Sequence, residues 1–167
     1  MSKRKITVIP GDGIGPSIIE SAIQILTHAG CDFEYEYADA GLVALEKHGE
    51  LLPQATLDLI EKNKVSLKGP LTTPVGGGFT SINVSLRKKF NLYANVRPVL
   101  SFKGTRSRYD NIDIITVREN TEGMYSGAGQ KRSDDNKSAE AMSIITREGA
   151  ERIVKFAFEL ARQEGRK

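Results

Sequence analysis

Aromatic residues, cysteine and histidine are scarce in this sequence of 167 residues: it has no Trp, one Cys and two His, and aromatics make up 7%. So few aromatic side chains disfavour a protein that binds single-stranded nucleic acid by stacking bases. The lone cysteine, Cys31, cannot form an internal disulfide. It fits a reducing compartment, and we expect the protein in the cytoplasm.

A large charge excess and a long apolar run are also missing. The net charge is +3, from 24 Lys and Arg against 21 Asp and Glu, which indicates no surface for nucleic acid or anionic membrane. The apolar runs are too short to cross a bilayer, and the basic start lacks the apolar region of a secretory signal. With 39% hydrophobic and 27% charged residues, the composition is typical of a chain that packs a core. We expect neither a nucleic acid nor a membrane as a partner.

The first half of the chain alternates between strand-like and helix-like segments. Short β-prone runs cover 5–9, 33–38 and 65–67, and helical patterns cover the stretch between Pro16 and Gly30, then 42–47 and 54–63. Strands and helices in this order predict an α/β layer with a parallel sheet.

The second half changes character. A helix is predicted over 82–90, and strands over 92–96 and 112–117. Residues 123–137 are polar without an apolar period, which is typical of a projecting arm, and 140–145 has the pattern of a strand in that arm. The clearest helix follows Thr146, a good N-cap, and ends at Gly165. Its apolar stripe consists of Ala150, Ile153, Val154, Ala157, Phe158 and Ala161.

Two glycine-rich segments look like nucleotide-binding loops but have the wrong spacing. In the run 11–16 (GDGIGP), Pro16 stands where the dinucleotide fingerprint requires its third glycine. We therefore disfavour a Rossmann phosphate site and interpret these glycines as a tight strand-to-helix turn. The glycines at 76–78 lack the Lys-Ser/Thr pair of a P-loop, so they predict only a loop.

The start of the helix at 82–90 carries groups suited to a carboxylate. Ser81 lies at the N-cap position, and Asn83 and Arg87 are four apart, hence on one helix face. Spare backbone N–H groups, a hydroxyl, an amide and a guanidinium together match a carboxylate ligand. An ordinary capped surface helix has the same pattern, and this segment alone favours that simpler interpretation.

Two further arginines lie at the ends of predicted strands. Arg97 ends the strand at 92–96, and Arg118 ends the strand at 112–117. An arginine on a mostly apolar strand face is costly unless it meets an anion. Together with Arg87, these residues can surround a ligand with several carboxylates, unless each one pairs with a nearby Asp or Glu.

The other candidates are weaker. Tyr125 can donate a proton from its phenol, although an isolated Tyr usually serves packing. His28 and His48 have no carboxylate or Cys partner at metal-binding spacing, and no acidic pair has the spacing of a Mg²⁺ site. We therefore expect no metal site within this chain.

Taken together, these segments resemble the isocitrate/isopropylmalate dehydrogenase family of metal-dependent β-decarboxylating dehydrogenases, most of all its NAD(P)-dependent isocitrate dehydrogenases. Five motifs carry the resemblance, in the family's order: 9–16 (IPGDGIGP), 68–74 (KGPLTTP), Ser81 with Asn83 and Arg87, 91–98 (NLYANVRP) and 118–125 (RENTEGMY). The similarity covers essentially the whole chain. It implies the layered sheet-and-helix fold of isopropylmalate dehydrogenase, an α/β fold that is not a Rossmann fold, left incomplete because the chain stops early.

The resemblance also implies roles for individual residues. The implied substrate ligands are Ser81, Asn83, Arg87, Arg97 and Arg118; Thr72 is implied to lie beside the nicotinamide end of the cofactor, and Tyr125 to be the catalytic proton donor. The polar pair Ser81 and Asn83 favours the isocitrate branch, because isopropylmalate enzymes tend to carry apolar residues there for an alkyl group. Homoisocitrate, another tricarboxylate, is a near competitor.

The implied reaction oxidises isocitrate with NAD or NADP and releases CO₂ to give 2-oxoglutarate, with Mg²⁺ or Mn²⁺ polarising the carbonyl. Family members continue beyond Lys167, and their later part supplies the general-base lysine, the metal-binding aspartates and most of the cofactor pocket. We therefore predict that this chain alone is inactive. The alternative function is a non-catalytic regulatory or tricarboxylate-binding subunit.

Domains and partners are also implied by the resemblance. Residues 1–92 are expected to begin the large α/β domain, 93–122 to form the first strands of the small domain, and 123–167 to form a clasp-like arm with its following helix. The expected partner is a second copy, giving a homodimer, or a complementing C-terminal chain. We also expect apolar helix faces to be left uncovered.

Overall fold

A computed structural model of the protein describes residues 3–74, 81–127 and 129–167. The chain forms two compact units, Met1–Asn83 and Val84–Lys167, and each is described by itself. Every described helix is too short or too polar to span a membrane. The glycine run at 76–78 lies outside the described residues.

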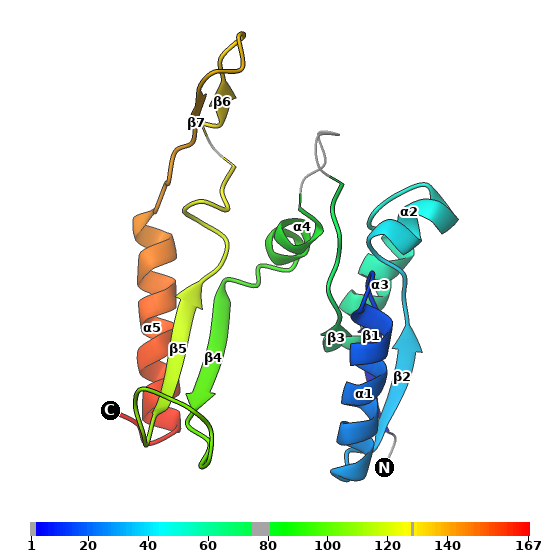
Figure 1. The fold of residues 1–167 in the computed structure, drawn as a ribbon, viewed down its shortest axis with the longest axis vertical. Helices are drawn as coiled ribbons and strands as arrows, with labels where there is room; N and C mark the ends of the chain where they lie inside the picture. The colour runs from blue at the N-terminus through cyan, green and yellow to red at the C-terminus, as the bar shows by residue number, and fades with distance from the viewer. Residues whose placement is uncertain (1–2, 75–80, 128) are drawn as a thin grey trace. The chain divides into compact units, whose positions relative to one another are not determined.

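The first unit is built on a parallel sheet of three strands in the order β2-β1-β3 (Figure 1). Its strands are β1 (Arg4–Ile9), β2 (Phe33–Tyr37) and β3 (Ser66–Lys68), and its helices are α1 (Gly15–His28), α2 (Leu42–His48) and α3 (Gln54–Asn63). Val8 of β1 pairs with Tyr37 on one side and Leu67 on the other, so β1 is the central strand. The predicted α/β layer with a parallel sheet is confirmed.

The central strand supplies the core of the first unit. Residues 6–9 are all buried, because a central parallel strand is covered on both faces. Thr7 interrupts this apolar run with a hydroxyl. That hydroxyl donates to the Leu59 carbonyl at 3.1 Å and accepts from the Asn63 amide at 3.0 Å. The buried polar group is therefore satisfied, and it ties α3 to the sheet.

The glycine-rich turn after β1 serves the packing of the first unit. Gly11 has a φ of +81°, and a Cβ there would collide with the Pro70 carbonyl oxygen. The Asp12 N–H donates to that same oxygen at 2.8 Å. Pro16 lies in the first turn of α1, as predicted. The segment is thus a tight strand-to-helix turn held against the loop that follows β3.

The second unit combines an antiparallel strand pair with one long helix (Figure 1). It contains most of α4 (Ile82–Lys89), then β4 (Ala94–Leu100), β5 (Asp113–Glu119), β6 (Lys131–Arg132), β7 (Ala139–Glu140) and α5 (Arg147–Gln163). The strand predicted over 92–96 begins and ends later, so Arg97 lies within β4 rather than at its end. Pro98 does not stop this strand, because a strand with one free edge tolerates proline.

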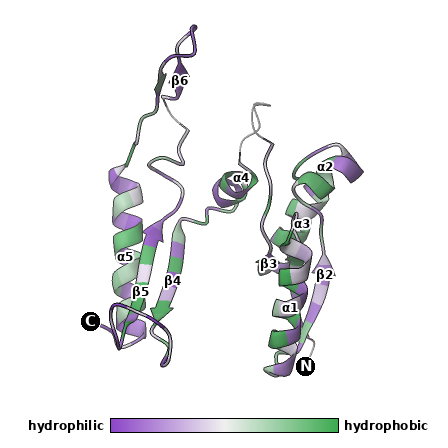
Figure 2. Ribbon diagram, viewed as in Figure 1, coloured by the Kyte–Doolittle hydropathy of each residue, from purple (hydrophilic) through white to green (hydrophobic). Residues whose placement is uncertain are grey.

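One face of α5 packs toward β5, and the stripe predicted for this helix is partly wrong. Val154 and Phe158 are 51% and 74% exposed. The inward face instead carries Phe156, whose ring meets Tyr93 edge-on with centroids 6.1 Å apart, and Leu160, which lines a groove beside β5. Figure 2 shows hydrophobic and hydrophilic positions interleaved along α5. The apolar residues of α5 cover two adjacent faces of the helix. The sequence therefore does not determine which of these faces packs against β5.

The arm after β5 holds a short antiparallel ribbon. Lys131 of β6 pairs with Glu140 of β7, and Gly123 forms a bridge with Ile144. The strand predicted over 140–145 is wrong in its bounds, since β7 ends at Glu140. Around β6 the arm is hydrophilic (Figure 2), in keeping with its composition. Neither face of the polar β6–β7 ribbon is buried, so its residues need not alternate between apolar and polar. The sequence therefore gives no clear signal for the strand bounds or their register.

Candidate anion-binding site

Tyr125 of the second unit lies beside two guanidinium groups. Arg118 donates from Nη2 to the Tyr125 phenol oxygen at 2.6 Å, and its Cζ is 5.3 Å from the centre of the ring. The Cζ of Arg87, from α4, is 5.4 Å from the same ring centre. The face of an aromatic ring attracts cations, so the ring holds both guanidinium groups near it. Two positive charges and a phenol are thereby gathered from distant parts of the sequence.

Arg97 shares one face of the β4–β5 pair with Arg118. Arg97 is opposite Thr116, and Arg118 is opposite Asn95. In an antiparallel pair, opposite residues and residues two apart point to the same face. Arg97 and Arg118 are therefore diagonal neighbours, about 7–8 Å apart in such a ladder. The Arg97 Nε donates to Asn95 Oδ1 at 3.2 Å.

None of these three arginines forms an ion pair within the described part of the chain. The ion pairs of the second unit belong to other basic residues, namely Lys137, Arg147, Arg152, Lys155 and Arg166. Arg97 and Arg118 are exposed, and Arg87 is half-buried. The alternative in which each arginine is neutralised by a nearby acid therefore does not hold among these residues. Neighbouring positive charges without a counterion favour an anion with more than one carboxylate.

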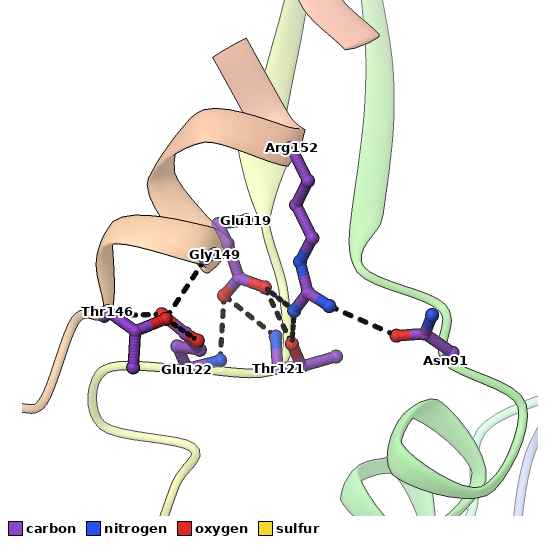
Figure 3. A network of polar contacts seen from close by, with 7 residues as sticks. All are labelled: Asn91, Glu119, Thr121, Glu122, Thr146, Gly149 and Arg152. Atoms are coloured by element: carbon purple, nitrogen blue, oxygen red, sulfur yellow. Dashed lines mark hydrogen bonds and ion pairs between the residues drawn. The ribbon is translucent and has the colours of Figure 1, made fainter. Parts of the chain in front are cut away.

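The chain bends at Thr121 and Glu122, just after β5, and Glu119 holds that turn (Figure 3). The Glu119 carboxylate accepts from the N–H of Thr121 at 2.8 Å, from the Thr121 hydroxyl at 2.6 Å and from the N–H of Glu122 at 2.7 Å. Burial raises the pKa of Glu119, but these hydrogen bonds outweigh burial, and the pKa lies below its ordinary value. The Tyr125 N–H then donates to the Glu122 carbonyl at 3.3 Å, so the turn leads to Tyr125.

A second carboxylate ties the same turn to α5 (Figure 3). Glu122 accepts from the Thr146 hydroxyl at 2.7 Å and from its N–H at 2.9 Å, and these bonds lower the pKa of Glu122. The predicted N-cap is confirmed, since the Thr146 hydroxyl accepts from the Gly149 N–H at 3.0 Å. A Cβ at Gly149 would collide with the Glu122 carboxylate, so this close approach requires glycine. The turn is fixed to the first residues of α5.

Ser81 and Asn83 lie at the start of α4. The helix begins at Ile82, so Ser81 holds the predicted N-cap position. The hydroxyl that bonds the helix end, however, is that of Thr73, whose Oγ1 accepts from the Ile82 N–H at 3.3 Å. Neither the Ser81 hydroxyl nor the Asn83 amide bonds another described residue. Both residues are half-buried.

Thr72 is fixed within the first unit by Asp12. The Thr72 N–H donates to Asp12 Oδ2 at 2.7 Å, and Asp12 Oδ1 accepts from the Val43 N–H at 3.2 Å. Asp12 is only 6% exposed. Gly41, with a φ of +83°, leaves room for the carboxylate, since a Cβ there would collide with it. Asp12 thus joins the glycine-rich turn to the Thr72 loop and to the start of α2.

Metal-ligating side chains do not gather in the part of the chain that the structure describes. No group of three or more His, Cys, Asp or Glu side chains there could hold a metal ion. His28 Nδ1 contacts the Gln24 carbonyl at 2.8 Å, and His48 Nε2 contacts Asp39 at 3.0 Å, which helps to lower the Asp39 pKa. These residues do not by themselves fit a divalent cation, and we assign no chemical step to one.

Sequence reasoning missed Arg152 and Asp12. A signal for Arg152 exists, because it lies four residues before Phe156 and eight before Leu160, which places it on the inward face of α5. Asp12 has no such signal. Its partners come from segments about 30 and 60 residues away, and only tertiary structure brings a turn residue to them.

The fold is that of an α/β protein whose second unit gathers Arg87 and Arg118 at Tyr125. Residues 5–167 match the family model described as isocitrate/isopropylmalate dehydrogenase. The chain belongs to this family, as its motifs indicate.

Curated relatives and solved structures agree with this assignment. The chain is 44% identical to a probable mitochondrial isocitrate dehydrogenase [NAD] subunit alpha of Drosophila melanogaster, over 98% of this chain and 43% of that one. It is 46% identical to the isocitrate dehydrogenase [NADP] of Thermus thermophilus, over 99% and 34%. The crystal structure of isocitrate dehydrogenase from Methylococcus capsulatus matches with a TM-score of 0.89 and 49% identity, over 98% of this chain and 49% of that chain.

Relatives with other names reach similar identity. A chloroplastic 3-isopropylmalate dehydrogenase of Solanum tuberosum and an isocitrate dehydrogenase [NAD] regulatory subunit of Dictyostelium discoideum are each 43% identical. The chain spans less than half the length of the curated relatives named here. Its relatives are thus NAD- or NADP-dependent dehydrogenases, and identity alone does not separate the substrates.

Proposed function

We propose that this chain is the N-terminal, substrate-binding part of an isocitrate dehydrogenase, which oxidatively decarboxylates isocitrate to 2-oxoglutarate with NAD or NADP. The observation that carries the proposal is the pair of guanidinium groups beside Tyr125, neither of which has an acidic partner among the described residues. Isocitrate carries three carboxylates, so its charge matches Arg87, Arg97 and Arg118.

Ser81 and Asn83 support isocitrate over isopropylmalate. Their hydroxyl and amide are half-buried and make no hydrogen bond to another described residue. A polar pair of this kind suits a carboxylate and disfavours the alkyl group of isopropylmalate, because a buried polar group left unpaired costs free energy. Homoisocitrate also presents three carboxylates and is the competitor to be tested.

In the proposed reaction this chain binds the substrate and supplies a proton. The arginines orient the carboxylates and balance their charge, and the Tyr125 hydroxyl delivers a proton to the product carbon after CO₂ has left. The Arg118 Nη2 donates to the Tyr125 oxygen and thereby aims the O–H hydrogen away from that guanidinium. Thr72 is the residue that would lie beside the nicotinamide end of NAD or NADP, which when bound would supply the hydride-accepting chemistry. Mg²⁺ or Mn²⁺ is proposed to be held outside this chain's described residues.

A homodimer, or a complementing C-terminal chain, is the proposed partner. The chain spans less than half the length of relatives that are named as isocitrate dehydrogenases. We therefore expect no isocitrate-dependent NAD(P)H formation by the chain alone. A cytoplasmic location is proposed from the single cysteine, while several relatives are named as mitochondrial or chloroplastic.

Isothermal titration calorimetry of the chain with isocitrate tests the proposal. Low ionic strength is needed because salt screens exposed charges. Arg118→Gln and Arg87→Gln should each weaken binding about 10–100-fold, since a hydrogen bond to a charged group contributes about 1.5–3 kcal/mol. Arg106→Gln is the matched control, because Arg106 is exposed in the second unit like Arg118 but has no ring contact with Tyr125.

Besides a failure of the unaltered chain to bind isocitrate, two outcomes contradict the proposal. One is tighter binding of 3-isopropylmalate than of isocitrate; the other is an equal loss of affinity in the Arg106 control.

The Dictyostelium regulatory relative supports a second candidate, a non-catalytic subunit. In that case Tyr125→Phe leaves the turnover of the assembled enzyme unchanged, whereas a proton donor requires that this variant lower kcat.

A further inference from the structure

We propose that Arg152 is a positioning residue that sets the anion-binding arrangement of Arg118 and Tyr125 without touching the substrate. The inference rests on the proposed function, which assigns those two residues to the substrate. Arg152 lies in the second turn of α5, on the face of β5 opposite to Arg118, and its side chain is 27% exposed.

One guanidinium contacts four residues from three segments, and Figure 3 shows three of them, Asn91, Glu119 and Thr121. Arg152 Nη2 donates to Glu119 Oε1 at 3.2 Å and to the Thr121 hydroxyl at 2.6 Å, and Nη1 donates to Asn91 Oδ1 at 3.2 Å. Its Cζ lies 4.9 Å from the centre of the Tyr93 ring. These partners come from the end of β5, from the turn after it, and from the stretch that leads into β4.

The contacts matter because those same segments carry the site. Glu119 directly follows Arg118 and points to the other face of β5. Its carboxylate shapes the turn that leads to Tyr125, and Arg152 neutralises that carboxylate while also holding the Thr121 hydroxyl. A shift of the turn therefore moves the Tyr125 oxygen relative to Arg118, where the present distance is 2.6 Å.

The geometry requires arginine rather than any cation. Two different nitrogens of one planar group reach Asn91 on one side and Glu119 with Thr121 on the other, and the same plane lies over Tyr93. A lysine ammonium is a single point charge on a flexible stem and cannot hold these positions together. Arg152→Lys therefore keeps the charge and disturbs the arrangement.

The test uses the full chain labelled with 3-fluorotyrosine, followed by ¹⁹F NMR and by calorimetry with isocitrate. Tyr125→Phe assigns the Tyr125 resonance among the five tyrosines. Arg152→Lys, Arg152→Ala and Thr121→Val should each shift or broaden that resonance. Arg152→Lys should weaken isocitrate binding about 10-fold, the scale typical when a group that orients a ligand is lost.

Arg166→Lys is the matched control. Arg166 follows the C-terminal end of α5 and pairs with Asp113 at 2.7 Å, so it makes the same kind of ion pair with the opposite end of β5. This control should leave both the Tyr125 resonance and isocitrate affinity unchanged at a similar melting temperature. A merely structural role for Arg152 predicts equal effects of the two lysine variants, and that result would overturn the inference.

The two readouts separate this inference from the proposed function. If the unaltered chain does not bind isocitrate, the proposed function fails, while the Tyr125 resonance still reports whether Arg152 positions the ring. If isocitrate binds and Arg152→Lys and Thr121→Val leave both the resonance and the affinity unchanged, the positioning role is refuted and the proposed function stands. The Thr121 variant retains the ion pair, so it yields an answer even where Arg152→Ala does not fold.

Discussion

Replacing Asn63 by alanine tests how much the buried polar cluster of the first unit stabilises its sheet. Asn63 ends α3 and is 7% exposed; its amide donates to the Thr7 hydroxyl at 3.0 Å and to the Glu36 carboxylate at 2.8 Å. Thr7 is fully buried, so Asn63→Ala removes the donor from a buried oxygen, a change that costs about 1–3 kcal/mol. The lost bond to Glu36 acts in the same direction.

The bond to Glu36 also gives this effect a pH dependence. Hydrogen bonds from Asn63, Lys62 and Lys5 lower the pKa of Glu36 from 4.5 to about 2. A carboxyl group with a lowered pKa in the folded state contributes stability that is complete above its unfolded pKa and is lost as the pH falls through the folded value. The destabilisation by Asn63→Ala should therefore be full at pH 7 and should shrink as the pH falls from 4.5 toward about 2.

Native-state hydrogen exchange of the β1 amides measures this effect in the first unit alone. We expect the free energy of opening for residues 6–9 to fall by about 1–3 kcal/mol at pH 7. Glu34→Gln is the control: Glu34 also pairs with Lys5, at 2.9 Å, but its side chain is 49% exposed, so little change is expected. Equal losses in the two variants, or no loss in Asn63→Ala, would refute the reasoning.

Three other substitutions test separate parts of the fold. Gly11→Ala should lower the urea midpoint of the first unit, because φ is +81° and the new Cβ meets the Pro70 carbonyl; an unchanged midpoint would contradict this. Thr146→Ala should cost the second unit about 1 kcal/mol in thermal melts, with Thr146→Ser as the conservative control that retains the cap. Phe158→Ser should reduce self-association in analytical ultracentrifugation, since this ring is 74% exposed; equal association constants would show that α5 does not mediate contact.

The first unit could be predicted well because its signals are local and agree with one another. Pro16 and Gly30 mark the limits of α1, and the apolar run at 6–9 gives the buried central strand. Where local signals conflict, the prediction failed. The strand predicted over 92–96 is too early, because pairing with β5 carries β4 through Pro98 to Leu100.

The residues of the candidate site could be named from the sequence, but their arrangement could not. Strand alternation and helical spacing identify Arg87, Arg97 and Arg118 as candidates, but they do not give the ring that gathers two of them. The ring follows the turn held by Glu119, and Glu119 itself contacts Arg152, 33 residues further along the chain. No periodic pattern records a pairing between residues at such a separation, so it has to be seen in three dimensions.

Adjacent residues of β5 point to opposite faces, so Arg118 is proposed to bind the substrate while Glu119 stabilises the turn. Mutations at the two positions can therefore separate binding from stability. Arg118 is exposed on the open face, so Arg118→Gln should change the free energy of unfolding of the second unit by no more than about 1 kcal/mol while isocitrate binding weakens. Glu119→Gln preserves size but removes the charge that accepts from two backbone N–H groups and pairs with Arg152, which should cost about 1–3 kcal/mol. Urea denaturation of both variants measures the contrast. A larger stability loss in Arg118→Gln than in Glu119→Gln would mean that the turn is held from the open face, and the division of roles between the two faces would be wrong.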